Sequence, residues 1–147
     1  MQSEFASASL DYLLDVTEPF ILSQLHDPSV ACGYLSLDEG LVPGKVHPSC
    51  DGRFRLALQP DGNLVLYQAV GAGWTPLWST GTIGAASAQV IMQADGNLVL
   101  HDTIGAWLWD SNTGGNPGAY ARVQDDGNFV VYSPSHSPLW ATDTCCH

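Results

Sequence analysis

Charged side chains are scarce in this chain, and basic ones most of all. Of its 147 residues 13% are charged, about half the share of an ordinary globular protein. Four basic side chains stand against fifteen acidic ones, which gives a net charge of -11. Nucleic acids and anionic lipid surfaces are bound through cations, so this composition predicts that neither is a partner.

Signatures of membrane insertion and of catalysis are missing as well. No apolar run approaches the roughly 20 residues needed to span a bilayer, which predicts no membrane insertion. The N-terminus shows no basic stretch followed by an apolar one, so no secretory signal is visible. The sequence lacks a Gly-x-Ser-x-Gly elbow, a phosphate-binding loop and a His-Glu-x-x-His pair. We therefore expect no catalytic residues, no cofactor and no metal.

A nine-residue pattern, Gln-x-Asp-Gly-Asn-x-Val-x-Tyr, occurs almost three times in the chain. It is intact at residues 59–67 and 124–132, and the copy at residues 93–101 differs only in its last position. A Leu-Trp pair follows each copy, and the tryptophans of these pairs recur at equal intervals, as Trp78, Trp109 and Trp140. Such repeats predict three copies of one supersecondary unit, which close around a common axis and bury the Leu-Trp pairs together.

Apolar and polar residues alternate on both sides of each Asp-Gly pair, which predicts a β-hairpin in every repeat. The residues predicted to face the core are Phe54, Leu56, Leu58, Leu64, Leu66, Val90, Met92, Leu98, Leu100, Ala121, Val123, Phe129 and Val131. With a further strand around each Leu-Trp pair, we predict an all-β domain of about twelve antiparallel strands over residues 34–147. Residues 1–33 carry leucines at helical spacing, which predicts a short, partly helical N-terminal extension.

The polar residues of the pattern predict one binding site per repeat. Alternate residues of an extended strand share a face, so each copy presents a carboxylate, two amides, a ring and a valine together. We call these sets site 1 (Gln59, Asp61, Asn63, Val65, Tyr67), site 2 (Gln93, Asp95, Asn97, Val99, His101) and site 3 (Gln124, Asp126, Asn128, Val130, Tyr132). Carboxylate and amide groups suit a neutral ligand covered with hydroxyls. Each set holds one carboxylate where glycoside hydrolysis needs two, which predicts binding without turnover.

The repeated pattern, with its Leu-Trp pairs, resembles the bulb-type (monocot mannose-binding) lectin family over roughly residues 34–147. The resemblance implies a β-prism II fold of three four-stranded antiparallel sheets with pseudo-threefold symmetry and one mannose site per sheet. In site 1 it implies that Asp61 and Asn63 hold the axial 2-hydroxyl of mannose and that Gln59 holds the 3-hydroxyl. It further implies that Tyr67 bonds the 4-hydroxyl while Val65 packs on the sugar ring. The residues of site 3 take the same roles.

Site 2 departs from the pattern because His101 stands where tyrosine is expected. An imidazole still makes a hydrogen bond, but it is shorter than a phenol and changes its charge between about pH 5 and 8. The sequence leaves three outcomes open: a weakened site, a site of altered specificity, and a site that binds nothing.

The four cysteines lie near the two ends of the β domain, as Cys32, Cys50, Cys145 and Cys146. Members of the resembled family often carry a disulfide that starts at the position after the motif aspartate, but glycine stands there in all three copies. We expect a bond from Cys32 or Cys50 to the terminal pair, or else a bond between two chains through that pair. An even number of cysteines fits an extracellular, secreted protein.

Two functions from different classes fit these features. The first is a lectin that recognises α-D-mannose or mannose-rich glycans through up to three weak sites, with affinity gained by multivalency. The second is a protein-interaction or antimicrobial (bacteriocin-like) module that uses the prism as a scaffold, with sugar binding secondary. Trp74 and Trp107 lie outside the predicted core, and we expect them to extend a site or to fill the interface of a homodimer.

Overall fold

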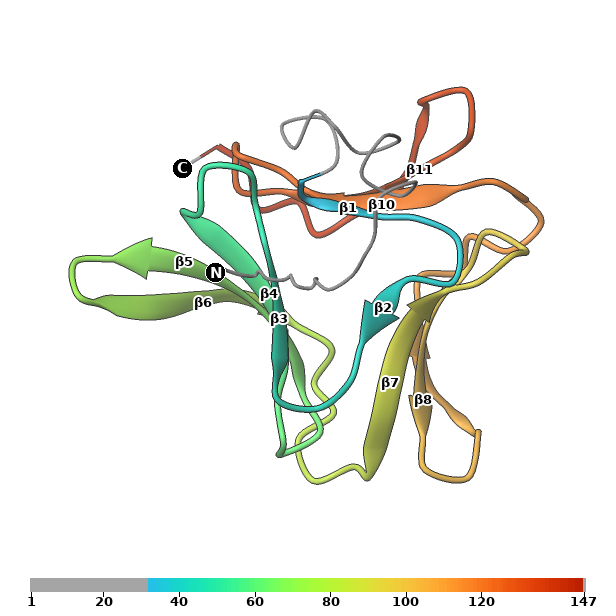
Figure 1. The fold of residues 1–147 in the computed structure, drawn as a ribbon, viewed down its shortest axis with the longest axis horizontal. Coiled ribbons are helices and arrows are strands. Elements are labelled where there is room, and N and C mark those ends of the chain that lie inside the picture. Colours follow the sequence, from blue (N-terminus) through green and yellow to red (C-terminus); the bar gives the residue numbers. More distant parts are fainter. Residues whose placement is uncertain (1–31, 147) are drawn as a thin grey trace, which may run out of the picture. The chain divides into compact units, whose positions relative to one another are not determined.

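Three antiparallel sheets of four strands each make up the described part of the computed structural model, residues 32–146 (Figure 1). Each repeat supplies three consecutive strands of one sheet. These are β4 (Phe54–Leu58), β5 (Leu64–Val70) and β6 (Gly73–Ser79), then β7 (Ser87–Met92), β8 (Leu98–Asp102) and β9 (Trp107–Asp110), then β10 (Tyr120–Val123), β11 (Phe129–Tyr132) and β12 (Pro138–Ala141). The predicted prism of three four-stranded sheets is confirmed. The partly helical extension predicted for residues 1–33 falls, up to residue 31, outside the described residues.

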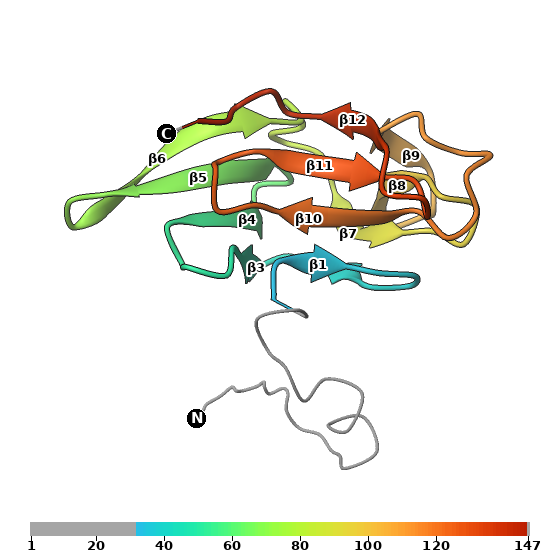
Figure 2. The same cartoon turned by 90° about the horizontal axis from the view of Figure 1, so that it is seen from above.

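Each sheet is completed by a short strand from the segment before the repeats. β1 (Tyr34–Leu35) pairs with β10, β2 (Gly40–Leu41) with β7, and β3 (Lys45–Pro48) with β4. The chain therefore passes the three sheets once with these short strands and returns through them in the reverse order with its repeats. Figures 1 and 2 show the sheets as the three sides of a prism, with the β5–β6 hairpin projecting beyond it.

The core lies between the three sheets and consists of the residues that alternation predicts to face inward. Each of the thirteen is at most 1% exposed. At the edge of this core Trp78, Trp109 and Trp140 meet edge to face, with ring centroids 5.3 to 5.5 Å apart. The tryptophans therefore close the prism around its axis as predicted. The leucines beside them are less buried than predicted, and Leu139 is 37% exposed.

The disulfides differ from the prediction. Cys145 and Cys146 are bonded to each other, and Cys32 and Cys50 are disulfide-bonded as well. The predicted bond from the N-terminal cysteines to the terminal pair is therefore wrong, because the terminal pair closes on itself. The same pairing leaves no sulfur of that pair for a bond between chains. Separately, no helix in the part of the chain described here is long and apolar enough to cross a membrane.

The close approach of β2 to β7 gives a test of the packing. A Cβ atom at Gly40 would lie 1.8 Å from the carbonyl oxygen of Val90, so Gly40→Ala forces the two strands apart. We expect the free energy of unfolding to fall by about 1 to 3 kcal/mol, as in an overpacked core. The control is Gly73→Ala, where the nearest atom lies 4.0 Å from the added Cβ. Urea unfolding followed by tryptophan fluorescence measures both, and equal midpoints would contradict the expected clash.

Candidate functional site

Each polar set is built around the turn between the first two strands of its repeat. In the first repeat the Gly62 N–H donates to the Gln59 carbonyl and the Gln59 N–H donates to the Asn63 carbonyl, at 3.0 and 2.9 Å. Gly62 has a φ of +95°, and a Cβ there would lie 2.2 Å from the Ala85 carbonyl oxygen, so only glycine fits. The Asp61 carboxylate accepts the Asn63 N–H at 3.0 Å and closes the turn. The other two repeats have the same backbone hydrogen bonds and a glycine of positive φ at the same position.

In sites 1 and 3 the turn, the glutamine and the tyrosine form one hydrogen-bonded set. The Tyr67 hydroxyl donates to Gln59 Oε1, and Gln59 Nε2 donates to both carboxylate oxygens of Asp61 at 3.2 and 3.0 Å. In site 3 the Tyr132 hydroxyl donates to Gln124, whose amide donates to the carboxylate at 3.2 and 3.1 Å. The structure thus brings the predicted polar residues together on one face. The valines of the three sites are at most 3% exposed, so they form the floor of each site.

The asparagine of each site is held by hydroxyl residues that the sequence reasoning missed. Asn63 Oδ1 accepts the Thr82 N–H at 3.1 Å and the Thr80 hydroxyl at 3.2 Å. Ser111 and Thr113 hold Asn97, and Thr142 and Thr144 hold Asn128, in the same way. Because the oxygen is fixed, the amide nitrogen is left to donate elsewhere. The signal in the sequence is a hydroxyl residue two and four positions after each core tryptophan.

Site 2 has a different arrangement of hydrogen bonds. Its Asn97 Nδ2 donates to Asp110 Oδ2 on β9 at 2.9 Å, whereas the corresponding nitrogens of sites 1 and 3 have no partner among residues 32–146. Gln93 Nε2 lies 3.1 Å from His101 Nε2 and makes no hydrogen bond to the aspartate of its own site. The His101 ring also packs against Trp107, with centroids 6.2 Å apart. With histidine in place of tyrosine, the glutamine amide nitrogen thus bonds the ring and not the carboxylate.

Sites 1 and 3 differ in what lies beside the tyrosine. Arg55 stands opposite Tyr67, and its guanidinium carbon lies 4.0 Å from the centre of the Trp74 ring. Beside site 3 the Tyr120 ring stacks on Tyr132 with centroids 5.4 Å apart. Burial raises the pKa of Tyr132 above its ordinary value, and the negative charge of the aspartate in the same site adds to the shift. The phenol of site 3 therefore stays protonated, and able to donate, over the whole neutral range.

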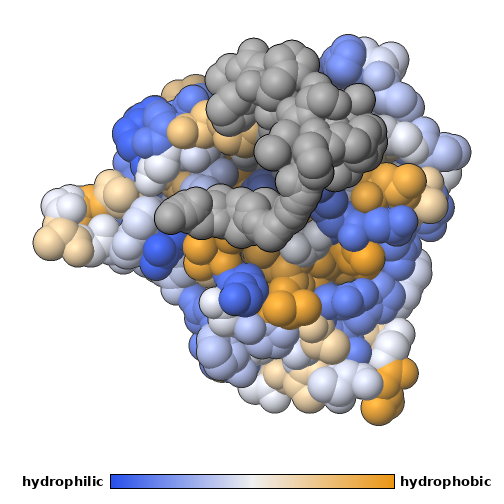
Figure 3. Space-filling view, viewed as in Figure 1, coloured by the Kyte–Doolittle hydropathy of each residue, from blue (hydrophilic) through white to orange (hydrophobic). Residues whose placement is uncertain are grey.

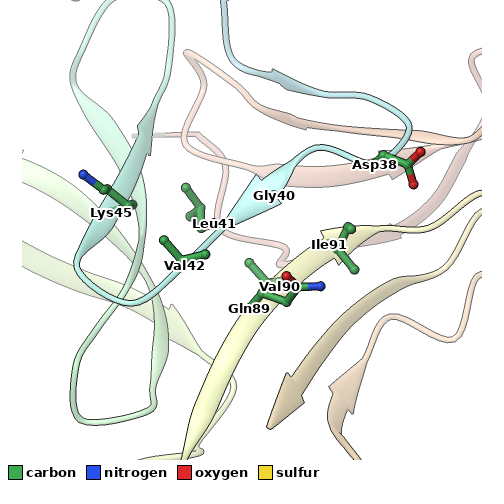
Figure 4. A pocket seen from close by; sticks show the side chains of 8 residues that line it. All are labelled: Asp38, Gly40, Leu41, Val42, Lys45, Gln89, Val90 and Ile91. Atoms are coloured by element: carbon green, nitrogen blue, oxygen red, sulfur yellow. The ribbon is translucent and has the colours of Figure 1, made fainter. Parts of the chain in front are cut away.

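Other places in the molecule offer less for a ligand. No group of three or more His, Cys, Asp or Glu side chains in the described region is placed to hold a metal ion. A hollow between β2 and β7 contains no residue of the three sites (Figure 4) and is lined by Asp38, Gly40, Leu41, Val42, Lys45, Gln89, Val90 and Ile91. Apolar side chains gather on the face shown in Figure 3. Val42, which lines the hollow, and Val46 on β3 are both exposed. The polar, co-facial residues of the repeats remain the candidate site.

Comparison with known proteins finds solved structures that share this architecture, while no protein-family model matches the chain. A monomeric monocot mannose-binding lectin from Gastrodia elata is 33% identical with a TM-score of 0.67, over 77% of this chain and 98% of that one. The mannose-specific agglutinin of snowdrop (Galanthus nivalis) bulbs, solved with methyl-α-D-mannoside, is 36% identical with a TM-score of 0.59, over 78% and 99%. A Marasmius oreades lectin is 29% identical with a TM-score of 0.69, over 77% and 92%.

One curated protein matches over a shorter segment. The B-type lectin plumieribetin from Scorpaena plumieri is 36% identical over 59 residues. The match covers 40% of this chain and 48% of plumieribetin, so the chain spans about half the length of that relative.

The hydroxyl residues behind the sites give a test of the scaffold. Thr113 Oγ1 donates to the Gly96 carbonyl at 2.6 Å, and no other side chain of the described residues bonds that oxygen. The equivalent Gly62 carbonyl accepts from two hydroxyls, those of Thr82 and Ser87, both at 2.7 Å. We therefore expect Thr113→Val to lower the free energy of unfolding by about 1 to 3 kcal/mol, and Thr82→Val to lower it less. Thermal unfolding of the two variants checks this order, and equal losses would refute it.

Proposed function

Because the chain belongs to the bulb-type mannose-binding lectin family, we propose that it binds α-D-mannose and mannose-rich glycans through sites 1 and 3. The family consists of non-catalytic lectins, so the prediction of a carbohydrate-binding protein that is not an enzyme is confirmed. The snowdrop agglutinin of this family is mannose-specific and was solved with methyl-α-D-mannoside.

The observation that carries the proposal is the pairing of an available donor with a charged acceptor in sites 1 and 3. The Asn63 side-chain amide nitrogen has no partner among the described residues. The backbone N–H of the same residue donates to the Asp61 carboxylate, so this free donor and the charged acceptor belong to one turn. A sugar hydroxyl both donates and accepts, so it suits such a pair. We assign the axial 2-hydroxyl of mannose to Asp61 and Asn63, and the same role to Asp126 and Asn128 in site 3.

The remaining residues of each site complete the proposed contacts. Gln59 and Tyr67 are bonded to each other in the free protein, and we assign to them the 3-hydroxyl and the 4-hydroxyl. Val65 lies as the floor below, where the C–H face of the ring would rest. Gln124, Tyr132 and Val130 take these roles in site 3. A ligand that left these polar groups unpaired would be rejected, which supports discrimination between sugars that differ in one hydroxyl.

The proposal also covers where the protein acts and how it gains affinity. Its four cysteines are all disulfide-bonded, which supports an extracellular location. We further propose that each site binds one sugar weakly and that affinity comes from two sites engaging clustered glycans. The described residues favour the lectin over the alternative interaction or antimicrobial module, because the polar sets are built twice with the same hydrogen bonds.

Paired substitutions in the two sites test the proposal. Asp61→Asn with Asp126→Asn keeps an oxygen for the turn but removes the charge that would bind the 2-hydroxyl. A hydrogen bond to a charged group is worth about 1.5 to 3 kcal/mol, so we expect affinity for mannose to fall at least about tenfold. On mannan-agarose the wild type should be retained and eluted by methyl α-D-mannoside, and the double variant should flow through.

A matched control uses an aspartate outside the three sites. Asp102 caps its own turn by accepting the N–H groups of Ile104 and Ala106 at 2.9 and 2.8 Å. Asp102→Asn should therefore leave retention on the column unchanged. A wild-type protein that passes through the column, or a double variant that is retained like the wild type, would rule out sites 1 and 3 as mannose sites.

A further inference from the structure

The three sites share one scaffold, so their differences can be assigned to single positions. One such position lies on the third strand of each repeat, directly opposite the valine of the site. Ser79 stands there beside site 1 and Ala141 beside site 3, and both are small. Asp110 stands there beside site 2, opposite Val99. Only site 2 therefore has a second carboxylate on the same face as its motif residues.

The Asp110 carboxylate occupies the donor that a sugar would need. Asn97 Nδ2 donates to Asp110 Oδ2 at 2.9 Å, and a hydrogen bond to a charged acceptor is about twice as strong as one to a neutral hydroxyl. The amide cannot turn away from it, because Asn97 Oδ1 is held by the Thr113 N–H at 3.1 Å and the Ser111 hydroxyl at 3.2 Å. A neutral ligand that used this donor would have to displace the bond and leave the Asp110 carboxylate without it.

The rest of site 2 is arranged consistently with a closed site. Gln93 bonds His101 and does not bridge to Asp95, so the set of hydrogen bonds seen in sites 1 and 3 is broken there.

We propose that Asp110 is the specificity-determining residue of site 2: its carboxylate acts as an internal ligand that closes this site to mannose and leaves the chain with two open sites. This inference rests on the mannose-binding function proposed above and names the residue that limits it. Site 2 differs from sites 1 and 3 at two positions, and the proposal gives each a different effect. His101 removes the phenol that could bond the sugar, whereas Asp110 occupies the Asn97 amide nitrogen.

The test follows the side-chain amide resonances of Asn63, Asn97 and Asn128 by NMR while methyl α-D-mannoside is added to the ¹⁵N-labelled full chain. In the wild type we expect the amides of Asn63 and Asn128 to shift and that of Asn97 to stay constant. Asp110→Ser places in site 2 the serine that stands at the equivalent position, Ser79, beside site 1. In this variant the Asn97 amide should respond, and the affinity of site 2 for the sugar should be at least about tenfold higher than in the wild type. Adding His101→Tyr should strengthen that response further, whereas His101→Tyr alone should leave Asn97 constant.

The reciprocal substitution is the matched control. Ser79→Asp puts the carboxylate opposite Val65, and we expect it to silence the Asn63 amide while the Asn128 amide still responds. The proposal is overturned if Asn97 responds in the wild type at the sugar concentration that shifts Asn63. It is equally overturned if Asp110→Ser leaves Asn97 silent, or if Ser79→Asp leaves Asn63 responsive. A wild type in which none of the three amides responds would instead contradict the mannose proposal, and this inference with it.

Discussion

The side-chain oxygen of the motif asparagine is the contact on which each site depends. In every repeat it accepts a backbone N–H from beyond the end of the third strand, and so ties that segment to the turn between the first two strands. The same contact decides the direction of the amide nitrogen. Whether that nitrogen is available or already bonded is then the main difference between the sites. One contact thus both stabilises the turn and, in sites 1 and 3, orients the amide nitrogen that is available to a ligand.

Closure of the prism depends on pairings between distant parts of the chain. The three tryptophans meet only when all three repeats are in place, and each sheet needs a strand from the segment before the first repeat. The pairing of β3 with β4 is local, whereas β1 pairs with β10 near the other end of the domain. No repeat is therefore a module with a complete sheet of its own, although each carries its own copy of the motif.

Much of this architecture can be read from the sequence, because alternation and repetition act over many residues at once. The alternation of apolar and polar residues predicts which side chains from Phe54 to Val131 face inward. Together with the Asp-Gly pairs, it also predicts the hairpin turns and the gathering of the motif residues on one face. The N-terminal strands do not, because a pair of residues such as Tyr34–Leu35 shows no period. The effect of Asp110 is equally hidden, since it depends on which side chain stands opposite Val99. The disulfide prediction failed because it assumed that cysteines near the two ends of the domain would meet.

The position opposite the site valine has a consequence beyond one sugar. Sites 1 and 3 lie on different sheets of the prism (Figure 1), so as the mannose sites proposed above they would engage separate glycan branches. A copy with two open sites would bridge at most two glycan branches, whereas a copy with three would bridge three. On the proposal made above, the Asp110 carboxylate on β9 would therefore set how many glycan branches one copy of the protein can bridge, by holding the Asn97 amide.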